Sequence, residues 1–343
     1  MKDLTKILSQ VAPIVDQIAH LSGVPGVSVG VFHQSDIIFR YNYGYRDLQS
    51  KEPTTSDTIY PIGSLTKAFT ALVYGSLVSN GTLDWHSPIR GILPEFRSSA
   101  EEVERLASAT DLLAHRTGIT GGETLYFHSR PLLNDSDIIP MFAALPAAQQ
   151  FRGQMQYNNL GYAMAAMAMS RTTGQSYEAL LETSLLQPLN LTRTGLRFDP
   201  RHTENMAKAY LVTEDKEAVE NTRPMFLPSS PTAAMGGIKS SIDDLLVLYR
   251  EVARETLRQP ESSAQVETPS PLKEVRTIVS GYAPLGGKRT GILERTYGLG
   301  WIRTQLPGEL GAIGLNPWLL KKMPVAGQNS PSRLAIYHQG NLP

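Results

Sequence analysis

The chain has 343 residues, of which 41% are hydrophobic and 19% charged, so it can bury a large core and is neither disordered nor fibrous. Its 32 basic and 32 acidic residues balance, which gives no net field for nucleic acid or an anionic membrane and predicts a small or neutral partner. There is no cysteine, which excludes disulfides and thiol catalysis, and the seven histidines lack metal-ligand spacing, so we expect no metal and no cofactor.

The N-terminal segment is predicted to form an amphipathic helix that packs on a sheet. Its apolar residues recur at three- and four-residue steps: Leu4, Ile7, Leu8, Val11, Ile14, Val15 and Ile18. Charged residues such as Asp3 and Lys6 interrupt the apolar run that a targeting signal needs, and no run of about eighteen apolar residues occurs. We therefore expect a cytoplasmic protein that does not enter a membrane.

A β-hairpin and a helix are predicted next. Residues 26–32 and 37–43 are rich in β-formers and are separated by polar residues, which is typical of a hairpin. The following helix begins near Ser64 and ends at Asn80 and Gly81, where glycine can adopt the left-handed conformation of a C-cap. Ser64 is therefore expected at a helix start.

Further along the chain, two helices precede a loop-rich segment. Apolar residues at helical spacing over 110–113 and 159–169 predict buried helices, and the second is rich in Ala and Met. Residues 258–290 contain four prolines and are predicted to form a loop-rich insertion.

No internal repeat or clean linker divides the chain. We interpret 1–343 as one domain, in which sheet-forming ends at about 1–60 and 290–343 enclose a helical subdomain at about 61–290.

Ser64 and Lys67 form a Ser-x-x-Lys motif, and three residues of helix bring the lysine back beside the serine. A serine hydroxyl needs a neighbouring base to become nucleophilic, and a lysine desolvated in a cleft has a pKa low enough to serve. The Ser64 amide at the helix start can stabilise the oxyanion of a tetrahedral intermediate. The alternative is a helix N-cap followed by a solvated lysine. The same spacing at Ser270–Lys273 is interpreted as a chance match, so other motifs must decide.

A second motif is Tyr157-Asn158-Asn159, the one Tyr-x-Asn of the chain. A tyrosine near Lys67 can share the serine proton as base and then deliver it to the leaving group, while Asn159 can donate to a substrate carbonyl. The alternative for Tyr157 is a core aromatic residue with a hydrogen-bonded hydroxyl.

A third motif is His338-Gln339-Gly340, which follows the strand-like run Leu334–Tyr337. On an edge strand beside the serine, Gly340 would let a substrate backbone approach closely, and the N–H of Asn341 would complete an oxyanion hole. The alternative for His338 is a polar surface residue at a strand end.

These three motifs, in this order, resemble the active-site triplet of the serine β-lactamase and penicillin-binding protein superfamily. Further stretches resemble class C β-lactamases and related esterases and transesterases: 60–64, 112–119, 236–241 and 297–301. The resemblance implies an α+β fold, in which helices flank an antiparallel sheet and form a helical subdomain. It also implies an acyl-enzyme on Ser64, with Lys67 and Tyr157 as the proton-handling pair. The substrate-binding residues that it implies are Asn159, His338, Gly340 and Asn341.

The resemblance also bears on substrate and on chain length. His338 stands where many relatives have lysine, and histidine there is common among esterases and transesterases, which favours acyl transfer over β-lactam hydrolysis. We therefore expect a serine hydrolase or acyltransferase for an ester, thioester or amide of a small molecule, a carrier-bound thioester included. In the superfamily two strands and a C-terminal helix follow the third motif, so a chain that stops at Pro343 is expected to be truncated. The alternative is a catalytically impaired protein with a binding role only.

Overall fold

The computed structural model describes two compact units. The described residues are 2–123, 133–198, 203–222, 226–258, 270–286, 293–311 and 323–341. Unit 1 comprises Met1–Pro61, Leu186–Pro224 and Lys239–Glu267, and unit 2 comprises Ile62–Leu185, Met225–Ile238 and Thr268–Pro343. The interpretation of the whole chain as one domain stays a prediction.

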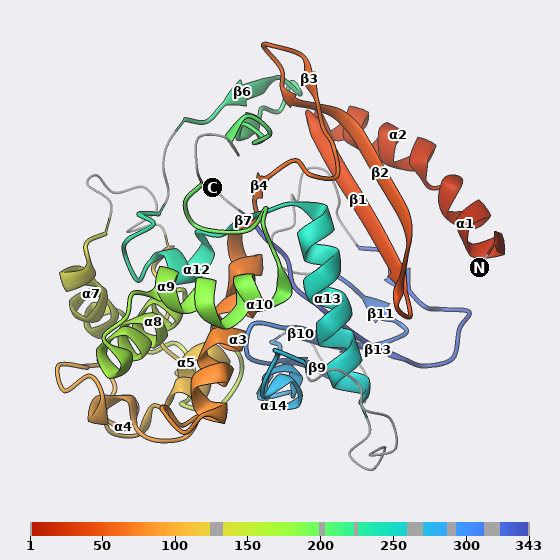
Figure 1. The fold of residues 1–343 in the computed structure, drawn as a ribbon. Helices are drawn as coiled ribbons and strands as arrows, with labels where there is room; N and C mark the ends of the chain where they lie inside the picture. Colours follow the sequence, from red (N-terminus) through yellow and green to blue (C-terminus); the bar gives the residue numbers. More distant parts are fainter. Residues whose placement is uncertain are drawn as a thin grey trace. The chain divides into compact units, whose positions relative to one another are not determined.

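Unit 1 is built on the predicted hairpin. Strand β1 (Gly26–His33) pairs antiparallel with β2 (Asp36–Asp47), with Val29 opposite Tyr41, and β2 pairs with β3 (Glu52–Pro53). Helix α13 (Ile242–Leu257) contacts β1, whereas α1 (Lys2–Ser9) and α2 (Ala12–Ser22) contact β2 (Figure 1). The remaining elements of unit 1 are β4 (Tyr60–Pro61), α10 (Gln187–Leu189), β5 (Tyr210–Val212), β6 (Ala218–Glu220) and β7 (Lys239–Ser240).

The N-terminal segment forms two helices, not one, because Pro13 lies in the first turn of α2 and cannot donate a backbone hydrogen bond. The prediction that all seven apolar residues share a buried face is wrong. Val15 is half-buried, whereas Ile7, Ile14 and Ile18 are 57%, 53% and 60% exposed. The seven residues form one apolar stripe, but only Leu8, Val11 and Val15 in it are half-buried, and Ile7, Ile14 and Ile18 remain exposed although α1 and α2 contact β2.

Unit 2 contains most of the helices. They are η1 (Gly63–Leu65), α3 (Thr66–Ser79), η2 (Ile89–Gly91), α4 (Glu101–Leu106), α5 (Ala109–Leu113), η3 (Asp135–Asp137), α7 (Ile138–Ala144), α8 (Leu160–Thr173), α9 (Tyr177–Leu181), α12 (Ala233–Gly236) and α14 (Val275–Val279), and a π-helical turn, η4 (Glu182–Leu186), lies at the boundary with unit 1. Helices α3 and α8 contact each other and are buried over most of their circumference (Figure 1). The burial of α5 and α8 confirms the prediction that residues 110–113 and 159–169 form buried helices.

A four-stranded antiparallel sheet completes unit 2. Its order is β13–β10–β9–β8, with bounds Leu334–Tyr337, Ile302–Gln305, Arg295–Tyr297 and Ala283–Pro284. Two short strands, β11 (Gly308–Glu309) and β12 (Val325–Ala326), pair beside it. The prediction of loop throughout 258–290 is wrong, because α14 and β8 lie within it; 259–269 and 287–290 fall outside the described residues. Helices with antiparallel sheets confirm the α+β class.

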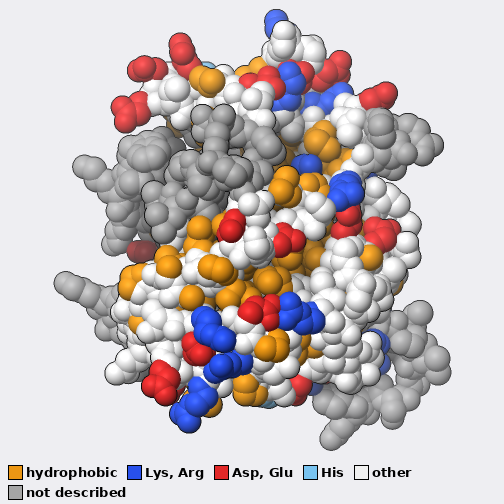
Figure 2. All heavy atoms as spheres, turned by 90° about the vertical axis from the view of Figure 1, so that its left-hand side faces the viewer, with side chains coloured by type: hydrophobic (Ala, Val, Ile, Leu, Met, Phe, Trp, Pro, Cys, Tyr) orange, Lys and Arg blue, Asp and Glu red, His pale blue; other side chains and the backbone are white. Residues whose placement is uncertain are grey.

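The described surface carries both signs of charge. In the view of Figure 2, acidic and basic side chains are interspersed among apolar ones, as the even charge count predicts. Among the helices that the structure describes, none combines the length and the apolar character needed to cross a bilayer.

Candidate active site

Ser64 lies in η1 and Lys67 follows one turn later in α3, so the helix places both side chains on one face. Lys67 is fully buried, whereas Ser64 is half-buried. The Lys67 Nζ lies 3.0 Å from Ser64 Oγ and also donates to two oxygens, Asn159 Oδ1 at 2.7 Å and the Met235 carbonyl at 2.6 Å. The predicted pair is therefore assembled around a buried amine with three polar partners.

This environment changes the acidity of Lys67. Burial lowers the pKa of Lys67 from 10.5 to about 7, and the charge of Glu123 opposes part of that effect. Near neutral pH much of the amine is therefore uncharged. Asn159 Oδ1 and the Met235 carbonyl can only accept hydrogen bonds, so they hold the two N–H groups of the neutral amine. The lone pair is then directed at the remaining partner, Ser64 Oγ.

Tyr157 supplies the other hydrogen bond to the nucleophile. Its hydroxyl donates to Ser64 Oγ at 2.8 Å, and its ring lies 5.0 Å from Lys67 Nζ. Burial raises the pKa of Tyr157 well above its usual value, although the hydrogen bond to Ser64 opposes this. The phenol is therefore protonated at neutral pH. The pKa of Lys67 is lowered and the pKa of Tyr157 is raised, so Lys67 is suited to act as base and Tyr157 as proton donor.

His115 packs against Tyr157 and holds its two chain neighbours. The two rings lie 4.2 Å apart between centroids, and His115 Nδ1 accepts a hydrogen bond from the Asn158 backbone N–H at 3.1 Å. The His115 carbonyl accepts from the Gln156 N–H at 2.8 Å, so both neighbours of Tyr157 in the chain are tied to one residue. Burial, with the Lys67 charge, holds the pKa of His115 well below its usual value, so this ring is neutral.

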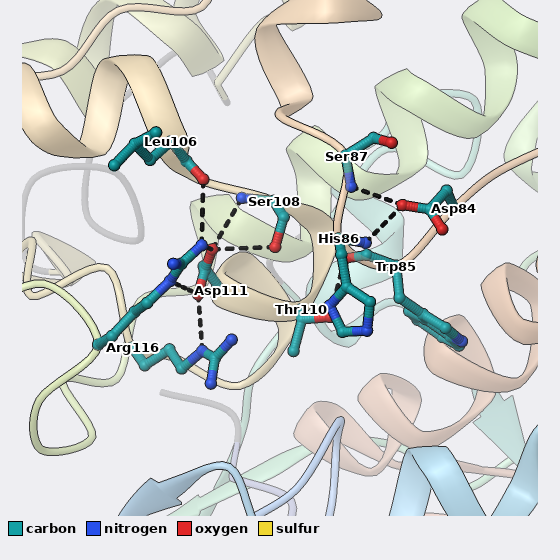
Figure 3. A network of polar contacts seen from close by, with 10 residues as sticks. Asp84, Trp85, His86, Ser87, Leu106, Ser108, Thr110, Asp111 and Arg116 are labelled. Atoms are coloured by element: carbon teal, nitrogen blue, oxygen red, sulfur yellow. Dashed lines mark hydrogen bonds and ion pairs between the residues drawn. The ribbon is translucent and has the colours of Figure 1, made fainter.

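A buried ion cluster fixes the segment that carries His115 (Figure 3). Asp111, whose side chain is fully buried, accepts hydrogen bonds from Arg116 Nε at 2.6 Å and from Arg152 Nε at 3.0 Å. It also caps α5 through the Ser108 hydroxyl and N–H, both at 2.9 Å. Although burial alone would raise it, these hydrogen bonds hold the pKa of Asp111 below its usual value. Arg116 directly follows His115 in the chain, and Arg152 lies in the segment that leads to Tyr157. The cluster therefore braces the segments that carry His115 and Tyr157.

The third predicted motif lies at the end of β13. His338 Nδ1 is 2.6 Å from the Gln339 carbonyl, which can only accept, so Nδ1 carries the proton and Nε2 accepts from Tyr297 Oη at 2.7 Å. Although part of the side chain remains exposed, both ring nitrogens are occupied. Desolvation, with the Lys67 charge, lowers the pKa of His338 to about 3. The ring is thus an uncharged group held by Tyr297.

Gly340 and Asn341 lie against the start of the Ser64 segment. A Cβ on Gly340 would stand 2.1 Å from the Ile62 carbonyl, so the chain's own backbone occupies the space that a substrate was expected to use. Gly63 has φ +53°, and its missing Cβ would lie 3.1 Å from the Asn341 backbone nitrogen. The amides of Ser64 and Asn341 therefore come from adjoining backbone segments.

Sequence reasoning missed Glu123. Its half-buried carboxylate accepts from Asn159 Nδ2 at 3.2 Å, while Asn159 Oδ1 accepts from Lys67. No periodicity or motif pointed to a single Glu after two glycines. The second Ser-x-x-Lys differs from the first in its geometry, because Lys273 Nζ reaches the Ser270 carbonyl at 3.1 Å and not the hydroxyl.

Comparison with known proteins gives a consistent picture. The family model described as Beta-lactamase matches residues 11–341. A Beta-lactamase of Escherichia coli (strain K12) is 25% identical over 235 residues, 68% of this chain and 57% of that protein. Protein flp of Staphylococcus aureus (strain MRSA252) is 26% identical over 242 residues, 69% of this chain and 47% of its own. The chain thus spans about half the length of these relatives. A Beta-lactamase of Pseudomonas fluorescens is 26% identical over 310 residues, 90% of this chain and 78% of its own.

Two solved structures share the fold. A penicillin-binding protein homologue from Pyrococcus abyssi has a TM-score of 0.71 at 21% identity, covering 87% of this chain and 67% of the other. A class C β-lactamase has a TM-score of 0.67 at 23% identity, covering 89% of this chain and 76% of the other. At these identities the likeness concerns the arrangement of helices and strands.

Proposed function

Because this chain belongs to the Beta-lactamase family, we propose that it is a serine hydrolase or acyltransferase that forms an acyl-enzyme on Ser64. One observation carries the proposal. Ser64 Oγ is hydrogen-bonded both to a buried amine with a pKa of about 7 and to a protonated phenol. A solvated lysine after a helix cap would have neither the burial nor the two carbonyl acceptors.

Acylation follows from the protonation states. Neutral Lys67 accepts the Ser64 proton as Oγ attacks the carbonyl carbon of the substrate, and the new Oγ–C bond gives a tetrahedral intermediate, which becomes the acyl-enzyme ester when the leaving group departs. The amides of Ser64 and Asn341 stabilise the oxyanion. Tyr157 donates its hydroxyl proton to the leaving oxygen, nitrogen or sulfur as that bond breaks, and the proton that Lys67 took from Ser64 then neutralises Tyr157, so one proton passes in total from Ser64 to the leaving group.

Deacylation reverses the proton path. Water or another acceptor attacks the acyl-enzyme, passes its proton to the pair formed by Tyr157 and Lys67, and Ser64 Oγ leaves with a proton restored. The identity of the acceptor decides between hydrolysis and acyl transfer. An ester, thioester or amide of a small molecule fits this chemistry. In a transferase, a carrier-bound thioester would donate the acyl group in the same step.

The relatives' names are compatible with varied acyl substrates. They include β-lactamases and, from Aspergillus violaceofuscus, an Unguisins hydrolase that is 28% identical over 234 residues, 64% of this chain and 41% of that protein. Because His338 is uncharged and held by Tyr297, it supports contact with an uncharged part of a substrate better than charge pairing.

Active-site labelling tests the proposal. The purified chain is treated with a neutral fluorophosphonate, the adduct is located by peptide mass spectrometry, and turnover of p-nitrophenyl butyrate is followed with and without an alcohol or thiol acceptor. We expect a single adduct on Ser64, which Ser64→Ala removes. Ser270→Ala, in the other Ser-x-x-Lys, is the matched control and should keep full labelling. A protein that binds the ester and is folded by circular dichroism, yet gives no adduct, would instead support the binding-only alternative.

A further inference from the structure

Glu123 is connected to the nucleophile through two side chains. Its Oε1 accepts from Asn159 Nδ2 at 3.2 Å, Asn159 Oδ1 accepts from Lys67 Nζ at 2.7 Å, and Lys67 Nζ lies 3.0 Å from Ser64 Oγ. An Asn amide has two N–H groups and Glu123 takes one, so the other remains available for a substrate carbonyl. A substrate group bound at the Asn159 amide therefore lies next to a carboxylate.

The other polar groups that surround the amine carry no charge when the base is ready to react. Tyr157 is a protonated phenol, and the rings of His115 and His338 are neutral. Lys67 itself must be neutral to accept the Ser64 proton. Within this set of described residues, Glu123 is the acidic side chain, and its charge acts on both Lys67 and Tyr157.

We propose that Glu123 makes this site select acyl substrates that are neutral or cationic beside the scissile carbonyl and reject those with an anionic group there. The inference rests on the proposed acyl-enzyme function of Ser64. The binding of a substrate whose negative charge lies about 6 Å from a carboxylate at the rim of a protein cleft is weakened by roughly tenfold or more after solvent screening. A positive charge at the same place strengthens binding by a similar factor. Asn159 fixes the position of this charge relative to the nucleophile, because its Nδ2 donates to Glu123 and its Oδ1 accepts from Lys67.

Three p-nitrophenyl esters with a neutral, an anionic and a cationic acyl end test the inference: butyrate, the succinate monoanion and 4-(trimethylammonio)butyrate. For the parent chain we expect kcat/KM for the neutral and cationic esters to exceed that for the anionic ester by about tenfold or more, with the ratio falling in 0.5 M NaCl. Glu123→Gln keeps an oxygen for Asn159 Nδ2 and removes the charge, so the three esters should then agree within about threefold. Glu101→Gln, an exposed carboxylate in α4, is the control and should keep the parent ratio.

The outcomes separate this inference from the proposed function. If no ester is turned over and Ser64 gives no fluorophosphonate adduct, both fail. If Ser64 is labelled and the parent shows no charge preference, or if Glu123→Gln keeps the full preference, this inference alone is overturned. Glu123→Asp provides a second variant in case the glutamine form folds poorly, because it withdraws the charge by one methylene and should give an intermediate ratio.

Discussion

Replacing Lys67 by methionine should stabilise the folded chain at pH 6 while abolishing Ser64 labelling. Methionine has a similar length and lacks the amine. Burial lowers the pKa of Lys67 from 10.5 to about 7, so below pH 7 both the folded and the unfolded chain carry the proton and the folded chain bears the full desolvation cost. At about 1.36 kcal/mol per pH unit, the gap between the two values corresponds to about 5 kcal/mol.

Lost hydrogen bonds offset part of that gain. The variant leaves Asn159 Oδ1 and the Met235 carbonyl without their donor, which costs about 1–2 kcal/mol each. We expect a net stabilisation of about 1–3 kcal/mol at pH 6. Between pH 7 and 10.5 the unfolded parent binds a proton that the folded parent does not, so the stability of the parent rises with pH. The advantage of the variant therefore shrinks across this window and reverses about one to two pH units above the pKa of Lys67.

Urea unfolding followed by circular dichroism at pH 6, 8 and 9.5 measures the difference. Lys51→Met, in the exposed turn before β3, is the control and should show no such dependence on pH. A Lys67→Met variant that is destabilised by the same amount at all three pH values would refute the reasoning, because the buried amine would then bear no desolvation cost.

Other outcomes are expected at the same site. Labelling of Ser64 should rise about tenfold from pH 6 to a plateau above pH 8, because its base has a pKa of about 7; a flat profile would contradict this. Tyr157→Phe should lower kcat/KM for a neutral ester by about 10²–10⁴-fold with an unchanged circular dichroism spectrum, and a loss below tenfold would argue against a proton donor. Asp111→Asn should cost about 2–4 kcal/mol in urea unfolding because it leaves two guanidinium groups unpaired, so an unchanged midpoint would count against the bracing role. Gly340→Ala should lower the melting temperature and ester turnover together, since its Cβ would stand 2.1 Å from the Ile62 carbonyl; parent-like values of both would contradict the close approach.

Local spacing made part of the site predictable. Lys67 returns beside Ser64 because three residues make most of a helical turn, and the hairpin and both buried helices follow from patterns within one element. That Tyr157 meets Ser64 depends on a contact between distant segments, and here the order of the three motifs carried the prediction.

Other features leave no trace in local sequence. Glu123 acts through Asn159, thirty-six residues later, and neither its neighbours nor its spacing distinguishes it from a solvated carboxylate. Which ring nitrogen of His338 donates and which accepts depends on Tyr297, which lies on another strand. For the N-terminal helices the helical period was right, but the period does not say how much of the apolar stripe the hairpin will cover, and Ile7, Ile14 and Ile18 stay exposed.

The close approach of Gly340 to Ile62 has a consequence for how the site matures. The proposed amide pair joins a segment that is translated early to one that emerges from the ribosome only with residue 341. A chain that lacks residue 341 can contain the whole Ser64 helix, yet it lacks one amide of the proposed oxyanion site. Acylating power should therefore require both segments to be present and packed together.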